Sequence, residues 1–428
     1  MKRAIVVGSG AGGATVAKEL QGKFAVTVLE AGQAFQPFSW ELSTLERLKE
    51  NGLLFDARAI RLLFPTMRIR KTPDMLLVNG KGLGGTTTIC TGNALRMDQE
   101  LQRLGFNLDA EFAEIYQEIP ISTVHQKRWH KPTRHLFEIC QELALEPQPT
   151  PKMGDYKECI SCGRCVLGCP QGAKWDSRRF LQAALDRGAQ LATGCQVERV
   201  IIEAGKATGV VARQGLRRRF FPADLVILAA GGLGTPVILQ NSGIPCEPRL
   251  FVDPVLTVAA YWPNALQCKE IAMPFVVQRE HFMISPYFDY LSFCFNRTWR
   301  HPAKDMLGMM IKLADANVGS ISRRTVEKRL TLADRQWLHT GVELCKEIFH
   351  RLGVKERDIV LGTINAGHPG GMLPLTAAER HSLHSARLPA NLYVADATLL
   401  PRSLGNPPIL TIIALAKRVS RVCTKVWA

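Results

Sequence analysis

Two short apolar runs flank a glycine-rich turn near residue 10. Residues 4–7 are an uninterrupted apolar run, which is typical of a parallel strand buried on both faces. Residues 14–20 have the pattern of a helix, and residues 26–29 form the second apolar run. The order strand, helix, strand predicts a βαβ unit, and therefore an α/β fold built on a parallel sheet.

Apolar runs later in the chain predict a second sheet. Residues 255–258, 275–277 and 307–313 have the composition of strands, and together they could form one antiparallel sheet. Residues 331–352 have an amphipathic helical pattern, with Thr331 placed to cap its N-terminus. We therefore expect a second domain of mixed helix and strand.

The glycine-rich turn at residues 8–13 matches the pattern G-x-G-x-x-G. In that pattern Gly8 permits a tight turn, Gly10 lets a pyrophosphate approach the backbone, and Gly13 lets the helix pack on the strand. The N-terminus of the helix offers free N–H groups to phosphate. Glu30, just after the second run, can accept hydrogen bonds from ribose hydroxyls. The ordered set predicts a dinucleotide site; a glycine-rich turn of an ordinary α/β unit is the alternative.

The balance of charged residues is strongly basic, with 54 Lys and Arg against 38 Asp and Glu and a formal net charge of +16. A solvated basic surface would explain this excess, and so would an acidic partner protein, an anionic membrane surface or an anionic substrate. Arginine runs such as residues 217–219 are too short to indicate nucleic-acid binding. No apolar run reaches the roughly 18 residues of a membrane span, and no signal peptide is expected. We predict a cytoplasmic protein, with contact to the inner membrane face through a partner as an option.

Twelve cysteines in such a chain indicate metal ligation in a reducing compartment rather than disulfides. Four of them are closely spaced: Cys159, Cys162, Cys165 and Cys169. Their C-x2-C-x2-C-x3-C-P spacing predicts an iron–sulfur cluster, with zinc or a redox-inert remnant as alternatives. In two-cluster ferredoxins the fourth cysteine serves the other cluster, and this sequence has no second motif. Either Cys169 folds back onto the same cluster, or a distant cysteine such as Cys195 completes it, or the cluster has three irons.

Three further stretches carry a family resemblance. Residues 82–87 read Gly-Leu-Gly-Gly-Thr-Thr, and Asn93 follows. The apolar run at residues 225–230 ends in Ala-Ala-Gly-Gly, and Asp396 is followed ten residues later by Asn406 and a proline. With the first glycine motif, these stretches resemble the glucose-methanol-choline (GMC) family of flavin oxidoreductases. Some multi-subunit GMC dehydrogenases also carry a cysteine-rich cluster insert, which favours ligation by the four local cysteines and a 4Fe-4S cluster over a 3Fe-4S cluster.

The resemblance implies that FAD binds across these motifs. In the family, the second glycine stretch lies over the flavin, and the closing Asp with its following backbone grips it. The residues that the motifs and the resemblance assign to the cofactor are Gly8, Gly10, Gly13, Glu30, Gly82, Gly84, Gly85, Thr86, Asn93, Ala230, Gly231, Asp396, Asn406 and Pro407.

The resemblance also places the chemistry. His368 lies in a Gly/Pro loop about thirty residues before the closing motif, where GMC enzymes have their catalytic His. A neutral imidazole can remove a hydroxyl proton while hydride leaves carbon for the flavin. Asn406 fits the second polar position of the family. The loop departs from the usual A-H-x-x-G-T pattern, since Met372 follows Gly371, and this leaves the substrate open.

The predicted protein is thus an FAD-dependent dehydrogenase of a CH–OH substrate, which passes electrons through the cluster to an acceptor protein, a partner subunit or a quinone-linked acceptor, without a role for nucleic acid. An oxygen-using oxidase with structural cysteines and a non-catalytic redox subunit are the alternatives. The expected organisation is an FAD-binding domain of residues 1–100, 155–245 and 360–428, a helical connection at 101–154, the cysteine-rich segment at 159–174, and an α+β substrate domain at 246–359.

Overall fold

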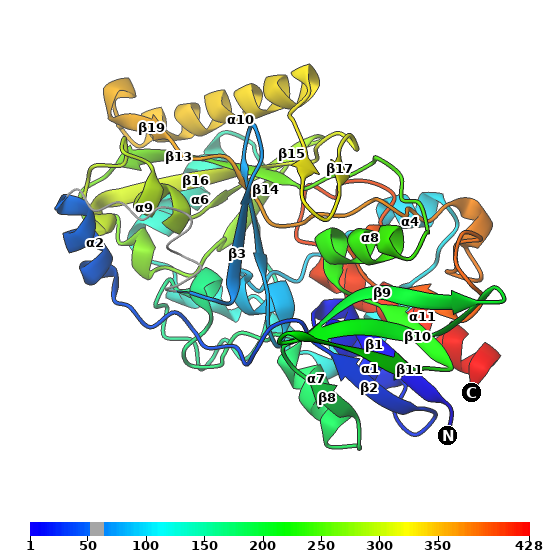
Figure 1. Cartoon of the computed structure of the whole chain (residues 1–428). Coiled ribbons are helices and arrows are strands. Elements are labelled where there is room, and N and C mark those ends of the chain that lie inside the picture. Colours follow the sequence, from blue (N-terminus) through cyan, green and yellow to red (C-terminus); the bar gives the residue numbers. More distant parts are fainter. Residues whose placement is uncertain (52–63) are drawn as a thin grey trace.

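A computed structural model describes residues 1–51 and 64–428 of the chain (Figure 1). Residues 52–63, which fall within the predicted FAD-binding stretch 1–100, lie outside the described part. The described elements arrange around two large sheets, each with its own hydrophobic core. The predicted α/β class is therefore confirmed.

The first sheet is parallel throughout and has five strands. In spatial order they are β21 (Leu392–Val394), β12 (Leu225–Leu228), β1 (Arg3–Val7), β2 (Ala25–Leu29) and β8 (Gln190–Ala192). Strand β1 is apolar because it is buried between neighbours on both sides, with Val7 opposite both Leu29 and Leu228. The carboxyl ends of strands from distant parts of the chain therefore meet at one edge.

Helices cover this sheet. Helix α1 (Ala11–Glu19) packs against α7 (Arg178–Leu185) and α11 (Ile409–Trp427). The buried Lys417 of α11 pairs with Glu19 of α1, 398 positions away in the sequence, at 2.8 Å. Figure 1 shows the two ends of the chain side by side, and Lys2 donates a hydrogen bond to the Trp427 carbonyl at 2.8 Å.

A smaller antiparallel sheet lies beside the first. Its strands, in the order β11 (Arg217–Pro222), β10 (Lys206–Gln214) and β9 (Cys195–Glu203), contain the arginine run and pack near α8 (Gly231–Asn241). The N-terminus of α8 follows β12 directly, so it points to the same sheet edge as the N-terminus of α1.

The second large sheet has nine strands, mostly antiparallel, and contains the three runs predicted between residues 255 and 313. Its strands are β3 (Met67–Lys71), β4 (Leu76–Gly80), β20 (Asn365–Ala366), β13 (Pro254–Tyr261), β16 (Met306–Leu313), β15 (Phe282–Pro286), β14 (Phe275–Gln278) and β6 (Gln148–Pro149), with β19 (Ile359–Leu361) paired to β13. Helix α10 (Leu332–Arg351) packs on this sheet, and Thr331 and Asp334 form a capping box at its start. Strands β3 and β4 join this sheet although they fall within residues 1–100.

The remaining described helices and strands lie outside the three sheets named above. They are α2 (Leu42–Glu50), α4 (Gln99–Arg103), α5 (Asp109–Glu118), α6 (Lys131–Glu142), α9 (Tyr290–Phe295), β5 (Ile121–Ser122), β7 (Lys152–Met153), β17 (Ser320–Ile321) and β18 (Val326–Glu327). The predicted cysteine-rich segment is a loop with one 3-10 turn, Cys165–Leu167.

Candidate functional site

A cleft of about 910 Å³, called the cofactor cleft below, lies at the carboxyl edge of the parallel sheet. Sequence-predicted cofactor residues from all four motifs line it: Gly8, Gly10, Glu30, Gly85, Thr86, Ala230, Gly231 and Asp396. Gly13, Gly82, Gly84 and Asn406 do not line it, while Asn93 and Pro407 line a neighbouring cavity. Most of the predicted set is thus brought together at one edge.

The first glycine motif has the geometry that a dinucleotide needs. Gly8 has φ +98°, and a Cβ there would lie 2.4 Å from the Ala229 carbonyl oxygen. A Cβ on Gly13 would lie 2.0 Å from the Gly8 oxygen, so only glycine allows this helix-to-strand contact. A Cβ on Gly10 would meet nothing within 4 Å, because the space above it is the cleft itself. Helix α1 begins there without a side-chain cap, which leaves its N-terminus to an anion.

Glu30 is held rigidly at the end of β2. Its carboxylate accepts hydrogen bonds from the Ser9 N–H at 3.1 Å, the Ser9 hydroxyl at 2.7 Å and the Gly32 N–H at 2.8 Å. The side chain is buried but lines the cleft. Its negative charge would repel a ribose 2′-phosphate, so the cleft suits FAD better than NADP, which carries that phosphate.

The second glycine stretch packs directly on the first. Gly82, Gly84 and Gly85 all have positive φ, and a Cβ on Gly85 would lie 3.1 Å from the Gly10 Cα. The Gly84 N–H donates to the Ser9 hydroxyl at 3.2 Å. Gly82 and Gly84 therefore shape the wall of the cleft without lining it.

Asp396 closes the cleft from the C-terminal side. Its carboxylate accepts hydrogen bonds from the N–H groups of Gly231 and Thr398, each at 2.8 Å, and from the Thr235 hydroxyl at 2.5 Å. Burial raises the pKa of this carboxyl group above its usual value. The Asn79 side-chain oxygen, which is buried at the cleft, has no hydrogen-bond partner among the described residues. An open cradle over Gly10 and an orphaned acceptor both fit a bound dinucleotide.

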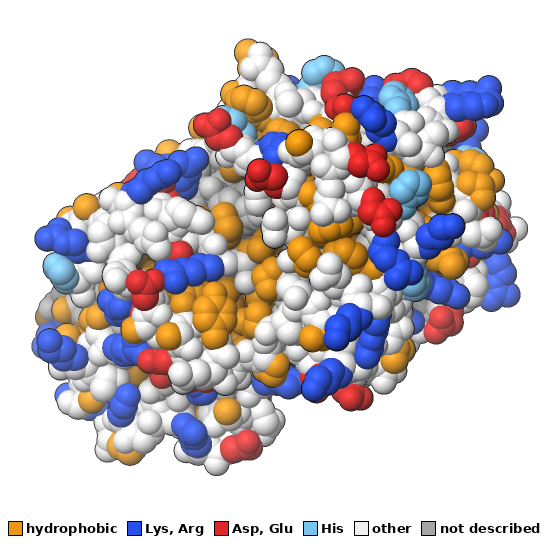
Figure 2. Space-filling view, turned by 180° about the vertical axis from the view of Figure 1, so that it is seen from behind, with side chains coloured by type: hydrophobic (Ala, Val, Ile, Leu, Met, Phe, Trp, Pro, Cys, Tyr) orange, Lys and Arg blue, Asp and Glu red, His pale blue; other side chains and the backbone are white. Residues whose placement is uncertain are grey.

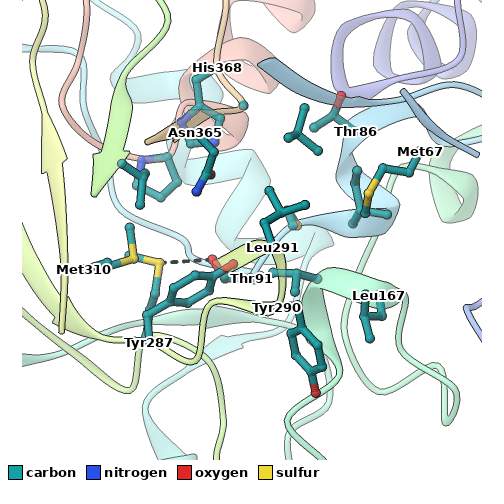
Figure 3. Close-up of a pocket in the computed structure, with 18 of the residues that line it drawn as sticks. Met67, Thr86, Thr91, Leu167, Tyr287, Tyr290, Leu291, Met310, Asn365 and His368 are labelled. Carbon is teal, nitrogen blue, oxygen red and sulfur yellow. Dashed lines mark hydrogen bonds between the residues drawn. The ribbon is translucent and has the colours of Figure 1, made fainter. Parts of the chain in front are cut away.

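A second cavity of about 190 Å³, the apolar cavity, adjoins the cofactor cleft (Figure 3). The two share Thr86, Cys90, Gly367, His368 and Ile409 in their walls. The rest of its lining is mostly apolar and includes Phe38, Phe64, Met67, Leu167, Leu291 and Met310. Figure 3 shows His368 and Asn365 together at one end of this cavity. His368 therefore stands where a substrate in the cavity would meet a cofactor in the cleft.

His368 belongs to a buried charge network. Its Nδ1 lies 3.3 Å from Asp253 Oδ2, and Lys312 Nζ lies 3.1 Å from the same oxygen. The Ser403 hydroxyl donates to the other Asp253 oxygen. An ionised carboxylate only accepts hydrogen bonds, so the Nδ1–H of His368 donates to Asp253 and leaves Nε2 as the free base. Asp253 also has φ +53°, a conformation that costs about 1–3 kcal/mol and is typical of functional sites.

The network keeps His368 neutral. Burial, and then the charge of Lys312, lower the pKa of His368 to about 4, while Asp253 acts in the opposite direction. Burial alone would raise the pKa of Asp253, but Lys312 and the hydrogen bond of His368 hold it below its usual value. The imidazole is therefore unprotonated and ready to accept a proton near neutral pH.

The two asparagines near His368 differ in their surroundings. Asn406 exchanges two hydrogen bonds with Gln278, at 3.0 and 3.2 Å, and does not line the apolar cavity. Asn365, which sequence reasoning missed, does line it. Its position three residues before His368 is the signal that could have found it. Asp253 and Lys312 were also missed, and no motif marks them.

The four predicted metal ligands, Cys159, Cys162, Cys165 and Cys169, line one small cavity of about 20 Å³, the cysteine cavity. Burial raises the pKa of the Cys165 thiol to about 11. Across the described residues, no group of three or more His, Cys, Asp or Glu side chains is arranged to hold a metal ion. Cys195 lines the cofactor cleft and not this cavity, so the structure does not support it as a distant fourth ligand. The four thiols have the chemistry of a tetrathiolate metal site and surround one cavity, but they are not arranged to hold a metal ion.

The sequence is basic, with a formal net charge of +16. Figure 2 shows Lys and Arg side chains spread over the face in view, with hydrophobic side chains gathered in its recessed centre. In the part of the chain that the structure describes, no helix is long and apolar enough to cross a bilayer.

Comparison with known proteins identifies relatives along the whole chain. A family model described as GMC oxidoreductase matches residues 3–255. An uncharacterized protein of Methanocaldococcus jannaschii is 26% identical over 97% of this chain and 98% of its own length. A long-chain-alcohol oxidase of Arabidopsis thaliana is 24% identical over 97% of this chain and 66% of its own length. The crystal structure of pyridoxine 4-oxidase from Mesorbium loti superposes with a TM-score of 0.75 and 15% identity, covering 98% of this chain and 99% of that one, which shows a shared fold.

Proposed function

Because the family model covers residues 3–255, the chain belongs to the GMC oxidoreductase family, and we propose that it is an FAD-dependent dehydrogenase of an apolar alcohol. The observation that carries the proposal is the position of His368 in the shared wall of the cofactor cleft and the apolar cavity. A base at that junction can take the hydroxyl proton of a substrate whose carbon faces the cofactor.

The residues that would hold FAD are those that line the cleft. The N-terminus of α1 at Gly10 suits the pyrophosphate, and Glu30 suits a ribose. Thr86 lies towards the apolar cavity, and Asp396 lies towards the closing loop. When bound, FAD supplies the hydride acceptor.

His368 would accept the substrate proton at Nε2, since Nδ1 is engaged by Asp253. Asp253 fixes the tautomer and the ring orientation, and its negative charge stabilises the imidazolium that forms. Lys312 balances the Asp253 charge, so the pair stays ionised while buried. Asn365, in place of Asn406, is positioned to orient the substrate hydroxyl.

The apolar cavity sets the substrate class. Its walls offer aromatic, methionine and leucine side chains, and His368 and Asn365 lie together at one end. A hydroxyl group on an aliphatic or aromatic body would place its polar end at His368 and bury the remainder. The name of the plant relative, a long-chain-alcohol oxidase, is in keeping with such a substrate.

We extend the proposal to electron exit. The cysteine cavity would hold an iron–sulfur cluster, 4Fe-4S or 3Fe-4S, that passes electrons singly to an acceptor protein. Support comes from the C-x2-C-x2-C-x3-C-P spacing and from the four cysteines around one cavity. The net charge of +16 favours an acidic acceptor, whose docking should weaken with salt; a partner at an anionic membrane surface is the alternative.

A second candidate is an oxidase that uses oxygen and keeps its cysteines for structure. The names of the plant and bacterial relatives, both oxidases, favour it. A redox subunit without turnover is the third reading, and the free base at His368 weighs against it.

The test is anaerobic stopped-flow reduction of the purified flavoprotein by primary alcohols of increasing chain length. We expect flavin absorbance that bleaches with substrate, faster for longer apolar alcohols than for ethanol or sugars. A protein without flavin, even after reconstitution with FAD, would overturn the cofactor assignment. Flavin that no alcohol bleaches would favour the non-catalytic subunit, and rapid reoxidation by air in an iron-free protein would favour the oxidase.

A further inference from the structure

Two buried lysines stand beside the cysteine cavity. Lys174 Nζ donates to four backbone carbonyls, those of Thr88 and Cys90 at 2.8 Å, Cys165 at 3.0 Å and Thr87 at 3.3 Å. Its side chain is 2% exposed and lines the cysteine cavity. One ammonium group thus ties the cysteine loop to the stretch that follows the second glycine motif.

Lys152 repeats this arrangement on the next strand. Its Nζ donates to the Ala272 carbonyl at 2.6 Å, to the Thr91 carbonyl at 3.3 Å and to the Asn93 side-chain oxygen. The residue is fully buried. Ala272 links it to the cysteines, because the Ala272 backbone acts to lower the pKa of the Cys165 thiol against the effect of burial.

Neither lysine has an ionic partner. Among the described residues, the ion pairs include no carboxylate for Lys152 or Lys174; their acceptors are carbonyl and amide oxygens and, for Lys174, also the Cys90 sulfur at 3.9 Å. Removing an ammonium ion from water costs several kcal/mol unless a negative charge compensates it. An anionic group in the cavity would compensate the charge of both lysines.

A third residue in the cavity wall lacks a partner. The Tyr156 hydroxyl is buried and has no hydrogen-bond partner in the described part of the chain, and the residue lines the cavity with the four cysteines. Gly92 makes room for it, since a Cβ there would lie 2.7 Å from the Tyr156 oxygen. Buried hydroxyls are normally satisfied, so this donor is in place for a group that enters the cavity.

We infer that Lys174 and Tyr156, which line the cysteine cavity, act together with Lys152 behind them as its counter-charge wall: they hold the negative charge of its thiolate-bound cluster and raise its reduction potential. This role rests on the cluster proposed above. Four thiolates outweigh the positive charge of an iron–sulfur core, so the centre is anionic and becomes more so when it gains an electron. Nearby cations and a hydrogen bond to sulfur favour the reduced form, and they favour iron–sulfur over a less charged occupant.

The experiment uses the full chain, reconstituted anaerobically with iron and sulfide. The variants are Lys174→Gln and Lys152→Met, which remove charge, Lys174→Arg, which keeps it, and Tyr156→Phe, which removes only the hydroxyl. Lys157→Met, an exposed lysine next to the same loop, is the matched control. The readouts are iron and sulfide per chain, the EPR spectrum after dithionite reduction, and the midpoint potential; flavin absorbance reports folding.

We expect each neutralised lysine to shift the oxidised-to-reduced ratio at fixed potential about tenfold towards the oxidised form, which is about 59 mV for a one-electron couple. Lys174→Arg should restore most of the shift, Tyr156→Phe should give a smaller one, and Lys157→Met should give none. If Lys152→Met fails to fold, Lys174→Gln and Tyr156→Phe decide the matter.

The outcomes separate this inference from the cluster itself. Wild-type protein that binds no iron would overturn both the cluster and its counter-charge wall. Iron bound at wild-type levels, with a midpoint potential that no variant moves, would leave the cluster in place and overturn only the role of the wall. A shift in Lys157→Met equal to that in Lys174→Gln would also overturn it, because the effect would then be one of general surface charge.

Discussion

Two pairs of buried lysines differ in how their positive charge is compensated. Lys312 and Lys328 each pair with a buried aspartate, Asp253 at 3.1 Å and Asp315 at 2.7 Å. Lys152 and Lys174 are buried equally deeply but have no carboxylate partner among the described residues; they contact carbonyl and amide oxygens and, for Lys174, the Cys90 sulfur at 3.9 Å. The first pair belongs to a site that is electrically complete within the polypeptide. The second pair belongs to a site that needs charge from outside, so the two regions differ in what the bare chain can stabilise.

The sharpest way to separate the two sites is to remove one essential group from each. His368→Ala should slow substrate-driven flavin reduction by about 10²–10⁴-fold, because the proton acceptor is lost, and leave iron content unchanged. Cys162→Ser should do the reverse: flavin still bleaches in a single turnover, but steady-state reduction of a one-electron acceptor collapses. Stopped-flow and steady-state assays measure the two steps. His381→Ala, an exposed histidine, is the control; unchanged flavin reduction in His368→Ala would move the base elsewhere.

The next effect concerns stability without cofactors. In iron-free protein, Lys312→Met should lower the free energy of unfolding by about 3–5 kcal/mol, because Asp253 is left buried without its cation. Lys152→Met should change it by about 1 kcal/mol or less, since the lost hydrogen bonds are offset by removal of an uncompensated charge. Urea titrations compare the two. Equal losses of unfolding free energy would show that the oxygens around Lys152 stabilise its charge as well as Asp253 stabilises the charge of Lys312.

A pH profile tests the paired site alone. With the pKa of His368 at about 4, flavin reduction should be independent of pH near neutrality and fall as pH drops through about 4. Lys312→Met removes a cation that lowers this pKa, so the fall should move up by about one pH unit, or roughly 1.4 kcal/mol. Since the folded pKa lies below the ordinary 6.5, His368 contributes stability above pH 6.5 that is lost as pH falls towards 4. A profile that Lys312→Met leaves unmoved would contradict this coupling.

The smallest effect distinguishes two asparagines. Asn365→Ala should slow flavin reduction by about fivefold, the loss of roughly 1 kcal/mol for one hydrogen bond to the substrate hydroxyl. Asn406→Ala should have less effect on that step, because its amide is already paired with Gln278. Rates at saturating substrate compare the two variants. A larger loss for Asn406→Ala would restore it as the second polar residue.

Sequence reasoning found the parts of the site that are local in the chain. Gly8, Gly10 and Glu30 belong to one βαβ unit, whose geometry follows from residue order. Asp253 and Lys312 escaped it because they meet through strand register. In the β13–β16 pairing, Val255 lies opposite Lys312, which brings the lysine beside Asp253. An apolar pattern predicts that strands exist but not which residues stand opposite one another.

The same limit explains why the sequence did not predict the partners of Asn406 and Lys174. The closing motif placed Asn406 near the substrate, but its actual partner, Gln278, lies on a strand 128 positions away. Lys174 ends the predicted cysteine-rich segment at 159–174, and three of its four carbonyl partners come from a stretch more than eighty positions earlier. Backbone carbonyls that surround a lysine in this way produce no characteristic residue spacing in the sequence.

The pairing of Lys417 with Glu19 also determines how late in synthesis the first βαβ unit can gain all its partners. Helix α1 packs on α11, and Asp396 and Ile412 line the cleft that begins at Gly8. At about 5–20 residues per second, the first βαβ unit must wait tens of seconds on the ribosome for the partners that complete it. Strand β1 lacks a neighbour on the β12 side until residue 228 has been made, and the cleft lacks Asp396 until the closing stretch has emerged. We therefore expect a nascent chain stalled before residue 396 to bind chaperones and not FAD.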